Sequence, residues 1–452
     1  MPPPSDPSPT VSTGLLAGLR AVPDASRYWV AYSGGLDSTV LLHAARALLG
    51  ERVAALHVHH GLQAAADQWA ERCRATAAAW GIDCRVREVD ARAAPGESPE
   101  AAARRARYAA LRAAVGHGEC VLLAHHQEDQ AETVLLQLLR GGGARGLAAM
   151  PAEAPFGAGR LARPWLGQPR AALEAYAAEH ALSWIDDPSN RDLRYDRNYL
   201  RHEIMPRLGA RWPAAAASLA RSARHAAQAA ELADALAAID LATVAEGAAL
   251  RIPALQALTP ARRDNALRHW LRTRGLALPD PVHLARVVNE VLGAAPDRAP
   301  YVHWGQVEVR RFRDRLYATP SLPPHQPTWR VAWDLRAPLE LPGGGRLTVQ
   351  TVRGAGLRVG ALEAGVTVGF RRGGEACALP GRAGTRPVKK LLQEAGLPPW
   401  VRERLPLVWV DERLAQVGDR WRCAPWAVAD GEPGLEIRWE APPALRPFLP
   451  AD

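Results

Sequence analysis

Residues 28–48, "YWVAYSGGLDSTVLLHAARAL", decide the fold because they combine a strand pattern, a glycine turn and a helix pattern. Residues 28–32 form a short apolar run typical of a buried strand, and residues 40–49 are rich in alanine and leucine, as in a helix. Two glycines allow a tight turn and the close approach of a ligand, while hydroxyl and carboxylate side chains can cap the helix. The predicted turn consists of Ser33, Gly34, Gly35, Leu36, Asp37, Ser38 and Thr39.

This strand, turn and helix predict an anion site. The first N–H groups of a helix have no acceptor within the helix, and the positive end of the helix dipole lies beside them. Phosphate is the expected anion. The turn lacks the spacing of both common nucleotide loops, G-x-x-x-x-G-K-[ST] and G-x-G-x-x-G, so it indicates a phosphate loop of another type.

Length and composition indicate a soluble globular protein with more than one domain. The chain has 452 residues, of which 48% are hydrophobic and 23% charged, enough for two or three domains. The start "MPPPSDPSPT" lacks the basic residues and apolar core of a signal peptide, so we expect residues 1–24 to form a flexible tail. The sequence contains no uncharged apolar run of about eighteen residues, so it predicts no membrane span. A cytoplasmic location is therefore expected.

The charge of the chain indicates the kind of partner it binds, and its cysteine content indicates whether disulfides or metal sites are expected. The net charge of +9 suggests a polyanionic partner. Arginine supplies 54 of the 56 basic residues, and the two lysines are adjacent, Lys389 and Lys390. Residues 190–224 hold eight arginines against three acidic residues, a candidate electrostatic footprint for nucleic acid. Five cysteines without any C-x-x-C pair predict neither a disulfide framework nor a cysteine-rich metal site.

The pattern along the chain predicts three folded regions. Apolar runs at residues 28–32, 53–58, 84–89 and 120–124 are each followed by a helical pattern, which predicts an α/β domain with a doubly wound parallel sheet over residues 25–214. In such sheets ligands bind at the carboxyl ends of the strands. We expect a mainly helical domain over 215–320 with a strand pair at 300–318, a linker over 321–335, and a small α+β domain over 336–452 with a helix at 389–395.

A second cluster of chemical groups lies in "LLAHHQEDQAETVLL", residues 122–136. His125 and His126 stand at the end of a predicted strand, and Asp129 and Glu132 share one face of the following helix. Carboxylates beside a phosphate loop can hold Mg²⁺ or bind a cationic substrate. A solvated acidic helix face stays open as an alternative. The two histidines could be structural, and they lack the further ligands of a zinc site.

These motifs carry a family resemblance. "SGGLDST" resembles the PP-loop of the N-type ATP pyrophosphatases, whose fold is adenine nucleotide α-hydrolase-like. This motif and six further motifs together resemble those of the tRNA(Ile)-lysidine synthetase family, and the resemblance extends over almost the whole chain. These motifs are "LHVHHGL" (56–62), "ARRARY" (103–108), "LLAHHQEDQAETVLLQLLRGGGARGLAAM" (122–150), "DDPSN" (186–190), "RNYLRHEIMP" (197–206) and the segment at 370–408.

The resemblance implies a reaction. Members of the family use ATP and free L-lysine to convert the wobble cytidine of an isoleucine tRNA with a CAU anticodon into lysidine, and they release AMP and pyrophosphate. The cytidine C2 oxygen is adenylated first, and the lysine ε-amine then displaces AMP. Codon specificity changes from AUG to AUA. The middle and C-terminal domains would bind tRNA, and neither a protein partner nor a membrane is implied.

The resemblance also implies roles for particular residues. Asp37, Arg104, Asp129 and Glu132 would be catalytic, and Arg107 matches the same arginine pattern as Arg104. The pair Asp129 and Glu132 would bind lysine, and Asp37 with Glu132 would bind Mg²⁺. ATP would be bound by Ser33, Gly34, Gly35, Leu36, Asp37, Ser38, Thr39, His57 and His125. The tRNA would be bound by Arg197, Asn198, Arg201, Lys389 and Lys390.

Alternatives stay open at this point. Arg104 and Arg107 could be surface arginines on an alanine-rich helix, and the lysine pair could be an ordinary solvated helix face. Another PP-loop tRNA-modifying enzyme, such as a 2-thiocytidine synthetase, would use paired cysteines or an iron–sulfur cluster, and the absence of C-x-x-C argues against it. A nucleic-acid-binding protein with a decayed ATP site is disfavoured because the acidic residues are intact.

Overall fold

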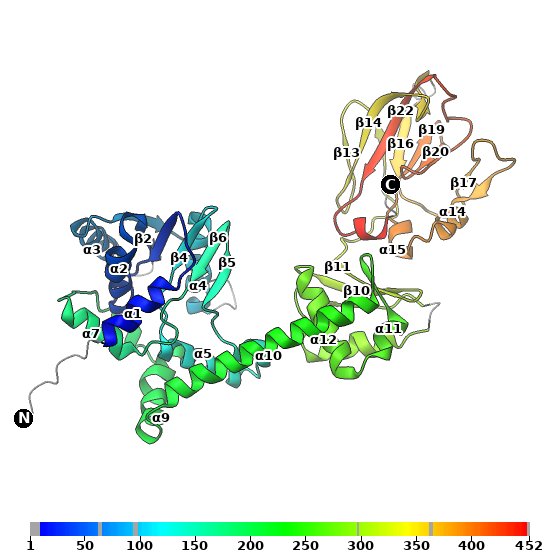
Figure 1. Cartoon of the computed structure of the whole chain (residues 1–452). Helices are drawn as coiled ribbons and strands as arrows, with labels where there is room; N and C mark the ends of the chain where they lie inside the picture. Colours follow the sequence, from blue (N-terminus) through cyan, green and yellow to red (C-terminus); the bar gives the residue numbers. More distant parts are fainter. Residues whose placement is uncertain (1–9, 62–65, 94–97, 296–297, 361–364, 450–452) are drawn as a thin grey trace, which may run out of the picture. The chain divides into compact units, whose positions relative to one another are not determined.

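The computed structural model describes residues 10–61, 66–93, 98–295, 298–360 and 365–449. The chain divides into two compact units, Met1–Leu232 and Ala233–Asp452, and each is described by itself (Figure 1). The division falls within helix α10 (Ala215–Val244), which begins in the first unit and ends in the second.

The first unit is built on a six-stranded sheet with the order β3-β2-β1-β4-β6-β5. All neighbouring strands are parallel except the edge pair of β5 and β6. This arrangement confirms the predicted parallel sheet, and the four predicted strands correspond to β1 to β4. The strands are β1 (Arg27–Ala31), β2 (Val53–His59), β3 (Asp83–Glu88), β4 (Glu119–Leu122), β5 (Glu153–Phe156) and β6 (Gly159–Ala162).

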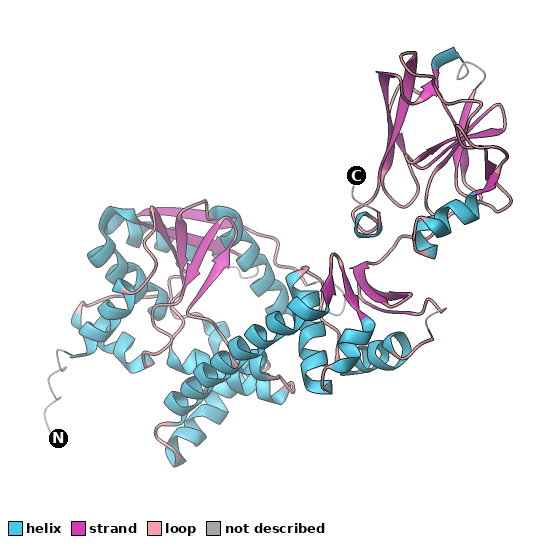
Figure 2. Cartoon of the chain, turned by 45° about the vertical axis from the view of Figure 1, so that its right-hand side comes forward, coloured by secondary structure: helices cyan, strands magenta, loops and turns pink. Residues whose placement is uncertain are grey.

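Helices cover both faces of this sheet (Figure 2). Successive side chains of a strand point to opposite faces, so Tyr28 and Val30 of β1 lie in one core and Trp29 in the other. The first core is closed by α1 (Thr10–Arg20), α2 (Leu36–Leu49), α3 (Ala66–Ala79) and α7 (Arg170–Glu179), and the second by α4 (Pro99–Ala114). The sheet is therefore doubly wound, as predicted.

The prediction of a flexible tail over residues 1–24 is wrong for the helix α1, while residues 1–9 lie outside the described part. Leu15 and Leu19 of α1 are fully buried in the first core. Their spacing of four residues places them on one face of the helix. The indole Nε1 of Trp165 also donates a hydrogen bond of 3.0 Å to the Leu15 carbonyl. The prediction missed this short amphipathic helix because the proline-rich residues before it indicate an irregular segment.

The remaining helical segments of the first unit come after β4 in the chain. Helix α5 follows β4 and contacts α8. The chain then runs through α9 into the long α10. The helical segments are α5 (Gln127–Leu139), α6 (Ala144–Leu147), η2 (Pro188–Arg191), α8 (Asp196–Tyr199), η3 (Leu200–Ile204) and α9 (Met205–Arg211).

The second unit begins with helices that pack on a small sheet. The strand order is β7-β8-β11-β10-β9, so the predicted strand pair at residues 300–318 corresponds to three antiparallel strands within a larger sheet. The helices are α11 (Ile252–Ala257), α12 (Pro260–Thr273), α13 (Pro281–Arg286) and η4 (Val287–Leu292). The strands are β7 (Ala245–Glu246), β8 (Ala249–Arg251), β9 (Tyr301–Trp304), β10 (Val307–Phe312) and β11 (Arg315–Pro320).

The C-terminal part is rich in strands. Its larger sheets have the orders β12-β16-β19-β20-β21 and β13-β14-β22-β15, and β17 pairs with β18. The strands are β12 (Arg330–Trp333), β13 (Leu339–Glu340), β14 (Arg346–Arg353), β15 (Leu357–Arg358), β16 (Val366–Gly369), β17 (Ala376–Cys377), β18 (Arg386–Pro387), β19 (Leu407–Val410), β20 (Arg413–Val417), β21 (Trp421–Arg422) and β22 (Pro433–Glu440). The helices are α14 (Val388–Glu394), α15 (Pro399–Arg402) and η6 (Arg446–Phe448).

Two expectations for this part are corrected. Residues 330–333, placed in the predicted linker, form β12, which pairs with β16 because Trp333 enters the core. Cys377 of β17 and Cys423 form a disulfide, although the sequence predicted no disulfide framework. The two cysteines are 46 residues apart, and only the tertiary fold brings them together. Among the described residues, none of the helices combines the length and the apolar composition that spanning a lipid bilayer requires.

Candidate active site

The order of the strands predicts where a ligand binds in the first unit. The chain passes from β1 through α2 to β2 on one side, whereas β4 pairs with β1 on the other side. Ligands of open α/β sheets bind where the order reverses, outside the carboxyl ends of the strands. Helices α2 and α5 follow β1 and β4, so both helix N-termini lie at this edge.

The glycine loop is shorter than predicted because α2 already begins at Leu36. Gly34 has a φ of +85°, which favours glycine. A Cβ atom there would also lie 2.7 Å from Ile185 Cδ1 and 2.9 Å from Cys73 Sγ, so no larger residue fits. Gly35 is the N-cap of α2. The predicted phosphate-binding residues from Leu36 to Thr39 therefore belong to the first helical turn. The Thr39 N–H already donates to the Gly35 carbonyl at 3.0 Å, so the N–H groups that lack an acceptor within the helix are those before Thr39.

Hydroxyl groups hold the loop in shape. The Ser33 N–H donates to Ser38 Oγ at 3.2 Å, and the Ser38 hydroxyl donates to the Gly35 carbonyl at 3.0 Å. The Thr39 hydroxyl donates to the Gly34 carbonyl at 3.2 Å. These bonds occupy the hydroxyls within the loop. Backbone N–H groups of the first turn are therefore the expected anion ligands.

His126 links the loop to α5. Its Nε2 lies 3.7 Å from Asp37 Oδ2 and 3.4 Å from Asp129 Oδ2, and its Nδ1 lies 3.0 Å from Glu128 Oε2. Burial lowers the pKa of His126, but the hydrogen bond with Glu128 and the charges of Asp129 and Asp37 raise it overall. The sequence prediction chose His125 and missed this role. The two adjacent histidines at the strand end indicated that a histidine could contact the loop. Their residue type alone does not tell which of the two rings lies beside Asp37.

Two carboxylates of α5 and two later arginines form a four-member ion network. Arg197 donates to Glu132 Oε2 at 2.8 Å and to Asp129 Oδ1 at 3.1 Å. Arg201 donates to Glu132 Oε1 and to Asp129 Oδ1, both at 2.7 Å. Asp129 is 7% exposed and Glu132 1%, so they are not a solvated helix face. Burial raises the pKa of Asp129, but the charges of His126 and Arg197 hold it below its ordinary value.

The two arginines of α4 differ in their surroundings. Arg104 is exposed, with its guanidinium 4.8 Å from the ring centre of Tyr108. The Nε of Arg107 is buried without a hydrogen-bond partner among the described residues, and burial lowers the pKa of this side chain. The geometry therefore favours Arg107 for contact with a bound anion. The catalytic role of Arg104 stays a prediction.

The predicted ATP ligand His57 is buried on β2, where its Nδ1 makes a 2.9 Å hydrogen bond with the Tyr32 carbonyl. Beyond it, the ends of β2 and β3 border a hollow of about 550 Å³ lined by His59, His60, Glu88 and Asp90 among others. This volume is within the range of small-ligand sites.

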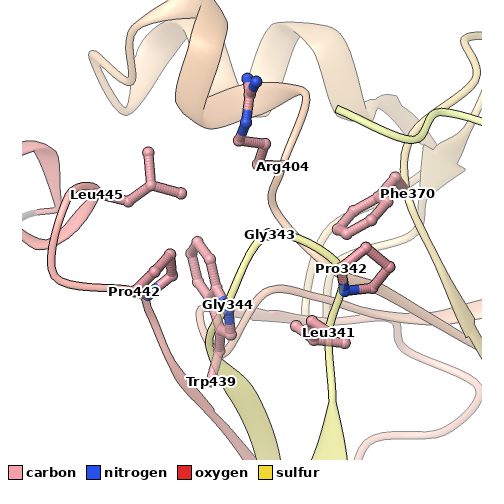
Figure 3. A pocket seen from close by; sticks show the side chains of 9 residues that line it. All are labelled: Leu341, Pro342, Gly343, Gly344, Phe370, Arg404, Trp439, Pro442 and Leu445. Atoms are coloured by element: carbon pink, nitrogen blue, oxygen red, sulfur yellow. The ribbon is translucent and has the colours of Figure 1, made fainter. Parts of the chain in front are cut away.

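Another hollow lies in the second unit. Figure 3 shows it between the glycine turn at Gly343 and Gly344 and the side chains of Phe370, Trp439 and Leu445. Its volume of about 10 Å³ is room for one water molecule, so it is not a candidate site for a substrate.

Asp37 offers a carboxylate oxygen of the kind that binds cations. Asp37 Oδ1 is buried and has no hydrogen-bond partner among the described residues, so a carboxylate oxygen is available beside the phosphate loop. Burial raises the pKa of this carboxyl, and a bound cation would offset that effect. Both oxygens of Glu132, the other predicted ligand, are bonded to arginines. Within the described ranges, no group of three side chains has the arrangement of a metal site.

The predicted tRNA ligands fall into two groups. Arg197 and Arg201 contact the acidic pair as described, and the amide of Asn198 donates to the carbonyls of Ser189 and Asp192, both at 3.0 Å. Lys389 and Lys390, by contrast, are exposed at the start of α14. The buried residues of that helix are Val388, Leu391 and Leu392.

Comparisons with known proteins agree with this geometry. Family models match residues 11–208 as a PP-loop domain, 250–317 as a TilS substrate binding domain and 366–439 as a TilS substrate C-terminal domain. The tRNA(Ile)-lysidine synthase of Alkalilimnicola ehrlichii is 48% identical over 91% of this chain and 94% of its own. That of Methylococcus capsulatus is 46% identical over 92% and 96%. That of Coxiella burnetii is 40% identical over 95% and 96%. The chain belongs to the tRNA(Ile)-lysidine synthase family.

Proposed function

We propose that this protein ligates L-lysine to C2 of the wobble cytidine in the isoleucine tRNA with a CAU anticodon. ATP is converted into AMP and diphosphate, and the codon read changes from AUG to AUA. The observation that carries the proposal is the meeting of the PP-loop, Asp37 and the buried acid–arginine network at one edge of the sheet. We place the activity in the cytoplasm, with neither a membrane nor a protein partner.

The first step is adenylation. The C2 oxygen of cytidine attacks the α-phosphorus of ATP, an O–P bond forms, and diphosphate leaves. The loop and the first turn of α2 bind the departing diphosphate through N–H groups and the helix dipole. Arg107, whose buried Nε has no hydrogen-bond partner among the described residues, neutralises charge that develops on the phosphates. Mg²⁺ held by Asp37 would supply further charge neutralisation.

The second step forms the C–N bond. The lysine ε-amine attacks C2, and the C2–O bond breaks to release AMP. The ε-ammonium must be held and must lose a proton before attack, and carboxylates suit both tasks. Asp129 and Glu132 are the carboxylates for this task. When the ammonium binds them, Arg197 and Arg201 can exchange their carboxylate partners for phosphates of the nucleotide or tRNA.

Binding of the tRNA requires more than the anticodon. Methionine tRNA carries the same CAU triplet, so an enzyme that contacts only the anticodon loop could not discriminate between the two. The second unit is the part of the chain that remains for contacts with other parts of the tRNA. Its exposed Lys389 and Lys390 are candidates for phosphate contacts.

Sulfur transfer, as in a 2-thiocytidine synthetase, is disfavoured by the high pKa values of two thiols in the first unit. Cys73 packs beneath Gly34, and burial raises the pKa of its thiol to about 12. Burial also raises the pKa of the Cys84 thiol to about 11. Because the thiolate is the reactive form, both groups are poor nucleophiles.

An assay of AMP release tests the proposal. The protein is incubated with ATP, lysine and a transcript of the CAU isoleucine tRNA, and each component is omitted in turn. We expect diphosphate release to require ATP and the tRNA, and AMP release to require lysine as well. AMP release that is independent of tRNA would contradict the proposal.

A further inference from the structure

Arg163 is a buried arginine at the end of β6 that the functional assignments above do not use. It is 7% exposed. Its Nε donates to His125 Nδ1 at 3.1 Å, its Nη1 to the Pro151 carbonyl at 2.8 Å, and its Nη2 to the Tyr108 hydroxyl at 3.4 Å. The guanidinium therefore joins the end of β6, helix α4 and the histidine that follows β4.

The contact with His125 determines the position of a proton. A guanidinium only donates hydrogen bonds, and it keeps its charge at all ordinary pH values. Nδ1 of His125 must therefore accept, so it carries a lone pair and no proton. In a neutral imidazole the single proton then resides on Nε2.

The surroundings keep this ring neutral. Burial lowers the pKa of His125 well below its ordinary value, and the charges of Arg163, Arg197 and Arg107 lower it further against the opposing charge of Asp129. A protonated ring would place an N–H on Nδ1, facing the N–H of Arg163. The ion network and the Arg163 contact thus favour the same neutral form.

The partners of Arg163 are unusual for a buried cation. All three acceptors that the described residues provide are neutral: an imidazole nitrogen, a carbonyl and a hydroxyl. A buried charge without a carboxylate partner is costly to the fold, and buried charges of this kind cluster at functional sites. Arg160, three residues earlier, is the contrasting case, since it is exposed and paired with Glu153 at 2.8 Å.

We propose that Arg163 is a positioning residue that holds His125 as the neutral Nε2–H tautomer, so that His125 donates a hydrogen bond to a phosphate oxygen of the nucleotide. The identity of this acceptor rests on the proposed function. His125 is then a hydrogen-bond donor and not the base that deprotonates lysine. That task falls to the carboxylates of α5.

The tautomer can be measured without any substrate. In protein labelled with ¹⁵N-histidine, long-range ¹H–¹⁵N spectra separate a protonated from an unprotonated ring nitrogen, and the variant His125→Ala assigns the signal. We expect the parent to show the Nε2–H tautomer. Arg163→Met should lose this preference, whereas Arg163→Lys, which keeps one donor, should retain it. Arg160→Met is the matched control on β6 and should leave the signal unchanged.

Turnover supplies the second readout. Arg163→Met should lower kcat for AMP release by about 10- to 100-fold, the range known for partners that orient metal-binding histidines, and Arg163→Lys should recover part of it. KM for lysine should not change. A parent His125 that carries its proton on Nδ1, or is an imidazolium, would overturn the proposal, as would an unchanged tautomer in folded Arg163→Met. A parent with the expected tautomer but without lysidine formation would instead refute the proposed function.

Discussion

Replacing Glu132 with Gln should destabilise the first unit strongly, because this carboxylate is the most buried member of the ion network. Glu132 is 1% exposed and accepts from Arg197 at 2.8 Å and from Arg201 at 2.7 Å. Glutamine keeps one acceptor oxygen but turns an N–H₂ group towards a guanidinium. Removing one partner of a buried pair costs roughly 3–5 kcal/mol. The two arginines are 21% and 26% exposed, so water compensates in part and we expect about 2–3 kcal/mol.

For a unit of this size, about 2–3 kcal/mol corresponds to a decrease in Tm of roughly 5–10 °C. The assay is thermal unfolding of the full chain without ligands, followed by far-ultraviolet circular dichroism. The matched control is Glu174→Gln, which breaks an exposed helical pair with Arg170 at 3.1 Å and should lower Tm by only about 1 °C. Equal shifts for the two variants would refute the view that the network is a buried structural element.

Asp37→Asn should abolish AMP release while tRNA affinity stays near that of the parent, because the change removes the available carboxylate oxygen and no phosphate contact; a variant with parent activity would refute the role of Asp37. Replacing both Lys389 and Lys390 with Ala should reduce the slope of log affinity for tRNA against log salt by about one to two units, and identical slopes would show a merely solvated helix face. The pKa of the Asp129 carboxyl is lower in the folded protein than in the unfolded chain. The ionised carboxylate therefore stabilises the fold at pH values above the unfolded pKa, and this stabilisation is lost as the pH falls from the unfolded pKa through the folded pKa. The stability difference between the parent and Asp129→Asn should therefore be largest near neutral pH and shrink below about pH 4.

Much of the fold was predictable because it follows from local patterns. The alternation of apolar runs and helical segments in residues 28–124 predicts parallel strands, and β1 to β4 confirm them. A strand that ends in two glycines and a helix start predicts the phosphate loop at the sheet edge. The position of the candidate site followed from the same patterns, since α2 and α5 both begin where strand order reverses.

Other features depend on contacts between distant residues. The burial of Leu15 and Leu19 requires the surface of α2 and α7, so the sequence of α1 alone suggests only a tail. Strand β12 exists because β16 pairs with it, more than thirty residues later in the numbering. Likewise, the sequence does not tell which histidine of the doublet contacts which partner. In the fold, His126 lies beside Asp37, and His125 accepts a hydrogen bond from Arg163.

The chemistry of the site has the same two origins. Asp129 and Glu132 share a helix face by their spacing alone. Their pairing with Arg197 and Arg201, about seventy residues away in the sequence, depends on the tertiary fold. The roles predicted for these residues in lysine and tRNA binding are now proposals with a defined geometry.

The central claim is best tested on the modified nucleoside itself. The protein is incubated with ATP, isotope-labelled lysine and a transcript of the CAU isoleucine tRNA, and the digested nucleosides are analysed by mass spectrometry, with a methionine tRNA transcript in parallel. We predict a nucleoside from the wobble position of the isoleucine tRNA that is heavier than cytidine by one lysine less one water and carries the label. An unmodified wobble cytidine, or equal modification of the methionine tRNA, would contradict the account.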